Sequence, residues 1–309
     1  REQPHTAMNI NELQKSFALP GHATIIAGRG GLPTIAIANA AASSEITLLG
    51  GHILSFTPKG QRDLLWMSPA SPFAPGTAIR GGVPLCWPWF GAHATNPDLP
   101  LHGFARTADW KLESITADGP SRTLVTLSLA DSSASHALWN HRFAVTLLVS
   151  IGATLEITLT TRNVDAAPFT ISQAIHTYFN ISHVDNVTIT GYDGTRYIDK
   201  VGGANRPERQ VGDIVINSEI DAVFQDNPGA SDILDSGFKR RITIAKEGSN
   251  SAVVWNPWIE KAKKLSGYTP EAYKTMVCVE TCNALEDART IQPGAAHSLK
   301  AIISASSLD

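Results

Sequence analysis

The chain has 309 residues and a formal net charge of −3, with 43% hydrophobic and 17% charged residues. This length suits one large globular domain or two ordinary ones, and the lack of a basic excess argues against a nucleic-acid partner. No run approaches the roughly 18 apolar residues of a membrane-spanning helix, and the first residues lack the apolar centre of a signal peptide. We therefore expect a cytoplasmic protein without a membrane partner, in which local arginines rather than the overall charge hold any anionic ligand.

The first predicted element is a short helix over residues 9–17, with Asn11 as its N-cap. Beyond it, alternation of apolar and polar residues replaces the helical period. Residues 45–49 and 53–56 flank a Gly-Gly pair, which predicts a bend or a hairpin.

The middle of the chain predicts a longer hairpin. Residues 143–149 and 154–160 both alternate, and a turn at Gly152 joins them, so we expect two antiparallel strands. Further strand patterns occupy residues 123–129, 169–175, 186–190, 241–245, 252–255, 276–280 and 297–304.

Many short strands without interleaved helices predict an all-β fold, a large antiparallel β-sandwich of two packed sheets with one curved into a cleft. No repeat and no Ser/Gly/Pro-rich linker divides the chain, so we expect one catalytic domain over residues 8–309. Met8 is a plausible natural start, which makes residues 1–7 an added or disordered tail. Residues 202–211 and 226–237 have the composition of variable loops.

Cysteine content and motifs give no support for a disulfide framework, a zinc site or a familiar nucleotide-binding or hydrolase motif. Cys86, Cys278 and Cys282 give no disulfide framework, and the C-x3-C pair has no second pair to complete a zinc site, so we expect reduced, buried thiols. The usual phosphate-loop, dinucleotide, serine-hydrolase and zinc-protease motifs are absent. His136 and His141 have no third ligand beside them, so these residues give no support for metal catalysis.

Residues 78–106 (AIRGGVPLCWPWFGAHATNPDLPLHGFAR) are too rich in glycine and proline for a helix or a long strand, and too aromatic for disorder. They predict a rigid irregular loop that presents Arg80, His102 and Arg106. Two guanidinium groups on one loop suit a phosphate or carboxylate clamp. The alternative is that each arginine pairs with an internal carboxylate.

Two later strands carry candidate proton-transfer groups. Strand alternation places His176 on one face with Tyr178, where an imidazole can exchange protons near neutral pH or make a purely structural hydrogen bond. Glu280 lies in or near the end of a strand that is apolar on both faces. Burial there would raise its pKa and suit a general base, whereas at the strand end it would reach solvent.

Asp221 and the aromatic loop that begins at Trp255 are candidates for sugar binding. Asp221 stands just before a strand-like run, where it either accepts sugar hydroxyls or caps a turn. A Trp face packs against the C–H groups of a sugar ring, although buried core Trp residues are commoner.

Five blocks, AIRGGVPLCWPWFG, LPLHGFAR, AIHTYFNI, VVWNPWIEK and MVCVET, together resemble the glucose-6-phosphate 1-epimerases, also called hexose-6-phosphate mutarotases. The resemblance runs from about residue 45 to the C-terminus. It implies a galactose-mutarotase-like β-supersandwich with the sugar in a cleft on one curved sheet. It also implies interconversion of the α and β anomers of a small-molecule hexose 6-phosphate, without a metal or an organic cofactor.

The resemblance assigns roles residue by residue. It implies that His176 and Glu280 are catalytic, and that Arg80 and Arg106 bind phosphate and sugar. Asp221 would bind sugar hydroxyls, and His102 would line the cleft. Some members carry a substrate-binding Gln where this chain has Leu101, which predicts one hydrogen bond fewer here.

The expected mechanism assigns Glu280 as the base at O1 and His176 as the acid at the ring oxygen, with the roles reversed on ring closure. Two alternatives remain open. One is a non-catalytic sugar-phosphate-binding or regulatory protein, which would not need both groups. The other is an aldose 1-epimerase acting on free sugars, which would not need two arginines. A monomer is the default expectation.

Overall fold

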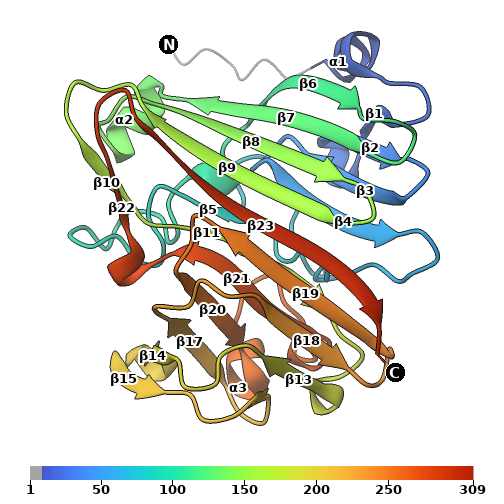
Figure 1. Ribbon diagram of the computed structural model, residues 1–309. Helices are drawn as coiled ribbons and strands as arrows, with labels where there is room; N and C mark the ends of the chain where they lie inside the picture. Colours follow the sequence, from blue (N-terminus) through green and yellow to red (C-terminus); the bar gives the residue numbers. More distant parts are fainter. Residues whose placement is uncertain (1–8, 309) are drawn as a thin grey trace.

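The computed structural model describes residues 9–308, and the expected tail, residues 1–7, lies outside them (Figure 1). The all-β prediction is confirmed, because strands form almost all the regular structure of this part of the chain. Its α-helices are short: α1 (Ile10–Phe17), α2 (Ser133–Leu138) and α3 (Trp258–Ala262). No helix in the described residues is long and apolar enough to cross a membrane.

The largest sheet has nine strands in the described residues, all antiparallel. Their order is β16 (Ile214–Val215), β13 (Val187–Thr190), β18 (Ser231–Asp235), β19 (Arg240–Glu247), β23 (Ala296–Ser307), β9 (Leu155–Asn163), β8 (Phe143–Ile151), β7 (Thr123–Ala130) and β6 (Lys111–Ala117). The expected hairpin is confirmed, because β8 and β9 pair antiparallel from Phe143 opposite Asn163 to Ile151 opposite Leu155.

The second large sheet has eight strands and carries the chemistry described below. Its strands are β15 (Arg206–Arg209), β14 (Arg196–Asp199), β17 (Ile220–Phe224), β20 (Ser251–Asn256), β21 (Met276–Asn283), β11 (Gln173–Ile175) and β5 (Leu85–Cys86), with β12 (Tyr178–Asn180) also paired to β21.

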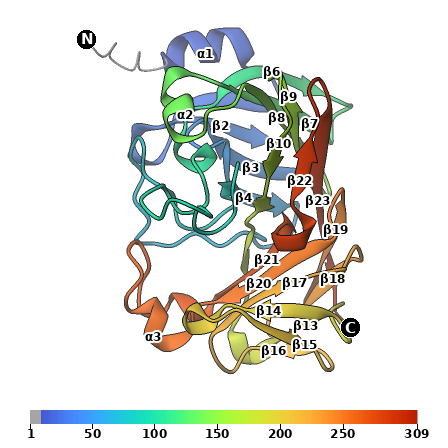
Figure 2. The same cartoon turned by 90° about the vertical axis from the view of Figure 1, so that its left-hand side faces the viewer.

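A third sheet was not expected from the sequence. It consists of β1 (Ala23–Ala27), β2 (Pro33–Ala38), β3 (Ala42–Thr47) and β4 (His52–Pro58), and its last two strands form the predicted hairpin around the Gly-Gly pair. A small ladder of β10 (Phe169–Ile171) and β22 (Arg289–Ile291) completes the strands of the described residues. In Figures 1 and 2 the four-stranded sheet lies toward the N-terminal end of the molecule and the eight-stranded sheet toward the opposite end.

The apolar faces of the three sheets meet in one continuous core. Leu147 of β8 and Leu159 of β9 contribute from the nine-stranded sheet, Ile35 of β2 from the four-stranded sheet, and Val277 and Val279 of β21 from the eight-stranded sheet. Alternation along each strand sends every second side chain into this core, so the remaining side chains of β21 face the other way. That a single domain spans residues 8–309 stays a prediction.

Three predicted boundaries differ from the structure. The N-cap of α1 is Asn9 rather than Asn11, because the extended Asn9 accepts a hydrogen bond from the Asn11 backbone N–H at 3.0 Å. The predicted strand over residues 169–175 divides at Ser172, whose backbone N–H donates to the carbonyl of Pro88 instead of continuing one ladder. Strands β15 and β18 lie in the two stretches expected to be variable loops.

The loop over residues 78–106 is irregular, as predicted, apart from β5 and a single 3-10 turn at Ala105–Thr107. Its backbone is fixed by close packing. Trp87 is fully buried and donates its indole N–H to Thr161 Oγ1 at 2.9 Å, and Gly103 has a φ of 70°. A Cβ at Gly103 would lie 2.1 Å from the Trp87 carbonyl oxygen.

Buried His52 fixes the start of the same loop. Its Nε2 lies 2.7 Å from the carbonyl oxygen of Gly81, which shows that Nε2 carries the proton. Burial lowers the pKa of His52 from 6.5 to about 4, with a smaller effect from the positive charge of Arg106.

Gly103→Ala combines a left-handed backbone with a backbone clash, so we expect a loss of about 2–5 kcal/mol of unfolding free energy. Gly119→Ala is the matched control, because Gly119 has a φ of 66° and open space around its Cβ position. There we expect only the backbone cost, about 1–2 kcal/mol. Urea unfolding measures both variants, and equal losses would contradict the packing assigned to residue 103.

His52→Gln tests the buried neutral imidazole. The folded protein keeps His52 neutral down to about pH 4, whereas the unfolded chain takes up a proton near pH 6.5. The stability that His52 contributes is therefore fully present above pH 6.5 and is lost as the pH falls. We expect the wild type to lose about 2 kcal/mol more unfolding free energy than His52→Gln between pH 7 and pH 5. Parallel pH profiles would show that His52 is not held neutral.

Candidate active site

The site is built on β21, an eight-residue strand that is buried along its whole length. β21 is central, as predicted, because it lies between β20 on one side and β11 and β12 on the other. Val277 and Val279 face the core, so Cys278 and Glu280 face the opposite side of the sheet. Glu280 is only 2% exposed, which rules out the alternative that it reaches solvent at the strand end.

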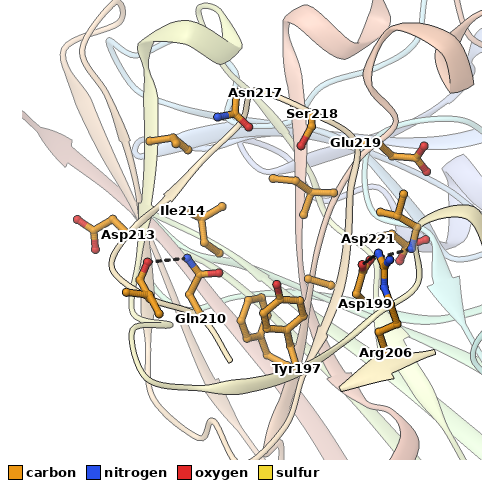
Figure 3. Close-up of a pocket in the computed structure, with 16 residues that line it drawn as sticks. Tyr197, Asp199, Arg206, Gln210, Asp213, Ile214, Asn217, Ser218, Glu219 and Asp221 are labelled. Atoms are coloured by element: carbon orange, nitrogen blue, oxygen red, sulfur yellow. Dashed lines mark hydrogen bonds and ion pairs between the residues drawn. The ribbon is translucent and has the colours of Figure 1, made fainter. Parts of the chain in front are cut away.

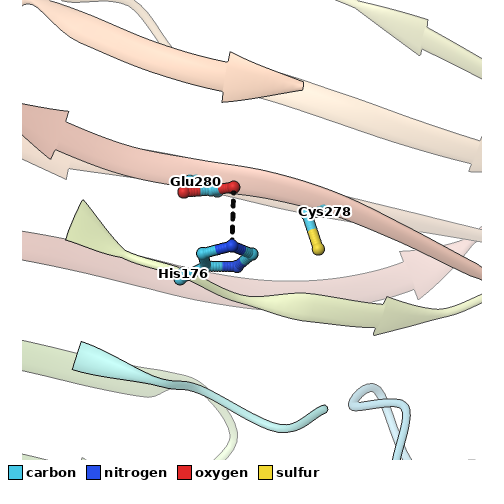
Figure 4. A group of neighbouring side chains, drawn as sticks. All are labelled: His176, Cys278 and Glu280. Carbon is cyan, nitrogen blue, oxygen red and sulfur yellow. Dashed lines mark ion pairs between the residues drawn. The ribbon is translucent and has the colours of Figure 1, made fainter. Parts of the chain in front are cut away.

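His176 lies opposite Glu280 across a gap in the neighbouring ladder. Ile175 at the end of β11 pairs with Thr281, and Tyr178 at the start of β12 pairs with Cys278. Continuing either register places His176 directly across from Glu280, and its Nε2 lies 3.3 Å from Glu280 Oε1 (Figure 4). The predicted shared face is confirmed, because the rings of His176 and Tyr178 stack at 5.0 Å with an interplanar angle of 11°.

The loop over residues 78–106 supplies the other edge of this strand. The backbone N–H of His176 donates to the carbonyl of Pro84, and that of Tyr178 donates to the carbonyl of Gly82. Carbonyl groups of the irregular loop thereby accept hydrogen bonds from backbone N–H groups of the interrupted strand, so these buried groups are paired. Because the bonds start at His176 and Tyr178 themselves, the loop also fixes where both rings stand.

Burial disfavours charge on both members of the pair. It lowers the pKa of His176 to about 3, assisted by the positive charge of Arg106, and raises that of Glu280 well above its usual value. The state that this burial favours is one proton between the two groups, because the pair then has no net charge whichever of them carries it. In the described residues, Glu280 Oε2 and His176 Nδ1 are buried without a hydrogen-bond partner.

His102 stands beside the pair, where the sequence placed it in the cleft. Its ring centroid lies 5.8 Å from that of His176, at an angle of 87°. Its Nδ1 accepts the backbone N–H of Gly91 at 3.0 Å, so the neutral ring carries its proton on Nε2. Burial, followed by the charge of His176, lowers the pKa of His102 well below its usual value.

Arg80 and Arg106 have no carboxylate partner. Within residues 9–308 neither forms an ion pair, so the alternative of internal pairing is wrong. Arg106 donates from Nη2 to the carbonyl oxygen of Leu101 at 2.9 Å, and the Arg80 guanidinium lies 5.9 Å from the centroid of the Tyr268 ring. Both positive charges help to lower the pKa of His176.

Leu101 stands where the family resemblance leads us to expect a Gln in some members. Its side chain is 53% exposed, while its carbonyl oxygen positions Arg106. The backbone role is therefore preserved whatever side chain stands there.

The sequence did not single out Tyr268. Its hydroxyl hydrogen-bonds the Tyr178 hydroxyl at 2.5 Å, so it links Arg80 to the ring stacked on His176. The neighbouring Gly267 also packs against Arg80, because a Cβ there would lie 2.8 Å from Arg80 Cγ, but the sequence alone carries no signal of this contact. Trp255, in the aromatic block, lies 6.2 Å from the His176 ring.

Asp221 lies on the same face but further along the sheet. It is within β17 rather than before a strand, and it pairs with Trp255, which pairs in turn with Cys278. Its closest cation is Lys261, whose Nζ is 3.9 Å away. Burial raises the pKa of Asp221. The structure therefore brings His176, Glu280 and His102 into direct proximity, with Asp221 two strands from β21.

A hollow of about 680 Å³ lies on the other face of β17 (Figure 3). Ile220, Ala222 and Phe224 line it, whereas Val223 packs with the Glu280 face. Asp221 also borders this hollow, but neither His176 nor Glu280 does. The hollow therefore borders Asp221 but does not contain the pair of His176 and Glu280.

Comparisons with known proteins identify the family of this chain. The sequence pattern of the family described as aldose 1-epimerase matches residues 33–304. Two similar proteins carry the name "Putative glucose-6-phosphate 1-epimerase". That of Cenchrus ciliaris is 35% identical over 259 residues, covering 81% of this chain and 78% of its own, and that of Escherichia coli K12 is 34% identical over 271 residues, covering 88% and 90%.

Solved structures give the same result. A crystal structure described as a "putative mutarotase (YeaD)" from Salmonella typhimurium has a TM-score of 0.87 at 30% identity and covers 96% of this chain and 99% of its own. A galactose mutarotase-like protein from Lactobacillus casei shares the fold, with a TM-score of 0.71 at 15% identity and coverage of 88% and 100%. The expected galactose-mutarotase-like fold is confirmed, and the chain belongs to the aldose 1-epimerase family.

Proposed function

We propose that the protein is a hexose-6-phosphate mutarotase that interconverts the α and β anomers of glucose 6-phosphate. The observation that carries the proposal is the buried pair of His176 and Glu280, which face each other at 3.3 Å beside two arginines without carboxylate partners. The names of the plant and E. coli relatives support the same substrate class.

The pair supplies both proton transfers that anomerisation needs. Glu280 takes the proton from the O1 hydroxyl while His176 gives a proton to the ring oxygen, and the bond between C1 and the ring oxygen breaks. The resulting open-chain aldehyde rotates about its C1–C2 bond. Ring closure on the opposite face of C1 reverses both transfers and restores the starting protonation. Positioned acid–base groups typically contribute about 10²–10⁴-fold each.

Binding of the substrate phosphate also affects the catalytic pair of His176 and Glu280. The working form needs the shared proton on His176 and a carboxylate on Glu280. The charges of Arg80 and Arg106 oppose a proton on His176. Arg106 also favours the carboxylate form of Glu280, so a phosphate dianion between the arginines weakens both effects. Binding energy from the unreacting phosphate therefore orients the sugar ring for proton transfer.

The same features bear on the two alternatives. A carboxyl group buried against a histidine costs stability, and a protein that only binds sugar phosphates has no use for it. Arginines free of internal carboxylates favour a phosphorylated sugar over a free one. We assign His102 to the wall of the sugar site and Asp221 to the sugar hydroxyls.

We also propose that the protein acts as a single-domain monomer in the cytoplasm. The support for the compartment is that Cys86, Cys278 and Cys282 are all free and buried, as suits a reducing environment.

Glu280→Gln and His176→Asn test the acid–base assignment. Glu280→Gln keeps the size of the side chain, and His176→Asn leaves a smaller polar one. Both remove the proton transfer, so we expect catalysed anomer exchange to fall by about 10²–10⁴-fold. Exchange NMR of glucose 6-phosphate measures the rate, and thermal unfolding checks that both variants fold. A folded variant with a near-wild-type rate would disprove its residue's role.

Arg106→Ala tests phosphate recognition. Losing a charge-assisted hydrogen bond of about 1.5–3 kcal/mol should raise KM for glucose 6-phosphate by roughly 10- to 100-fold. Exchange of free glucose should hardly change. Arg162→Ala is the matched control, because Arg162 is also bonded to a carbonyl oxygen, that of Gly294, at 2.9 Å. If glucose and its 6-phosphate respond equally to Arg106→Ala, Arg106 does not bind the phosphate.

A further inference from the structure

A thiol that the proposed reaction does not use lies beside the acid–base pair. Cys278 precedes Glu280 by two residues on β21 and therefore shares its face, and His176 faces both from the neighbouring strand (Figure 4). One nitrogen, one sulfur and one carboxylate oxygen of these three buried side chains lie within 4.8 Å of one another.

The spacing suits a tetrahedral metal ion. Zinc bonds of about 2.0–2.1 Å to nitrogen and oxygen put those two atoms roughly 3.3 Å apart at tetrahedral angles. The observed distance between His176 Nε2 and Glu280 Oε1 is 3.3 Å. Zinc also requires the sulfur roughly 3.5 Å from both atoms. The three atoms lie within 4.8 Å of one another, so binding the ion would draw the Cys278 sulfur closer to the other two.

The chemistry of the three side chains points the same way. Imidazole, thiolate and carboxylate are the ligands that zinc takes in proteins, and three protein ligands leave the fourth position open to water or substrate. Independently, Glu280 Oε2 is buried without a partner among the described residues. A cation bound to Glu280 would offset the cost of burying this oxygen without a hydrogen-bond partner.

We propose that His176, Cys278 and Glu280 form an inhibitory Zn²⁺ site. The bound ion occupies the space of the shared proton and takes both catalytic groups out of the reaction, so it competes with the sugar phosphate. Metal binding stands on the geometry alone, whereas the inhibition rests on the proposed function. Epimerisation itself requires no metal.

Binding displaces protons. The Cys278 thiol and the Glu280 carboxyl group lose theirs to solvent when they bind the ion. Burial raises the pKa of both groups. The apparent affinity for zinc should therefore increase with pH.

Direct binding is tested with Co²⁺ and Zn²⁺ on wild type, Cys278→Ala and Cys282→Ala. Cys282 is the matched control, a second free, buried thiol on the same strand. We expect Co²⁺ to give a thiolate charge-transfer absorption with wild type and Cys282→Ala only. The Zn²⁺ affinity of Cys278→Ala should fall by at least roughly 10- to 100-fold, the cost of losing even an outer partner of a metal ligand. An absorption that persists in Cys278→Ala, or none in wild type, would overturn the site.

Inhibition is tested by exchange NMR of glucose 6-phosphate with and without Zn²⁺. We expect Zn²⁺ to raise the apparent KM of wild type and Cys282→Ala, with recovery on adding a chelator. Cys278→Ala should keep its basal rate and resist the metal. Equal inhibition of both Cys variants would overturn the proposal. If Zn²⁺ binds through Cys278 yet leaves the exchange rate unchanged, the catalytic assignment of His176 and Glu280 fails while the metal site stands.

Discussion

A carboxyl group buried at the centre of a sheet, with an imidazole directly across from it, is the constraint on which the rest of this structure depends. β21 is buried along its whole length, so Glu280 cannot reach water. Its neighbouring strand is interrupted at His176, and the carbonyl groups of Pro84 and Gly82 take up the backbone bonds there. The irregular loop is therefore part of the same arrangement: it completes the strand that carries the histidine.

The electrostatics follow from that burial. A single charge on either member of the pair would be expensive at this depth, whereas one proton shared between them leaves the pair neutral. Arg80 and Arg106 carry positive charges nearby that no carboxylate of the described residues pairs with. Arg80 lies over the ring of Tyr268, and Arg106 donates a hydrogen bond to the carbonyl oxygen of Leu101. An anionic substrate would supply the missing compensation. In this account the loop selects the phosphorylated sugar, and the two strands carry out the proton transfers.

Alternation of apolar and polar residues predicts much of the fold, because a strand buried on one face must repeat every two residues. The pairing of β8 with β9 follows from it, whereas the central position of β21 was predicted because that strand is apolar on both faces. The third sheet was missed. Its first strand is Ala23–Ala27, whose buried and exposed side chains do not alternate strictly. The break at Ser172 was missed for another reason: it depends on a carbonyl group more than 80 residues away, which local pattern does not record.

The site was predicted in its chemistry more than in its geometry. Residue types and the family resemblance pointed to His176 and Glu280, but their contact depends on the register between β21 and its neighbours. Tyr268 was not predicted, because its contact is with Arg80, which is distant in the sequence. Asp221 lies inside a strand, not before one, because β17 starts one residue earlier, at Ile220.

The central claim is that this buried pair epimerises a phosphorylated hexose selected by the two arginines. Exchange NMR of glucose 6-phosphate beside free glucose, with the wild-type protein, tests it most directly. We expect the wild-type protein to catalyse exchange of the glucose 6-phosphate anomers, with a kcat/KM well above that for glucose. Equal efficiency toward both sugars would contradict the role of the arginines, and no acceleration of either would contradict the role of the pair.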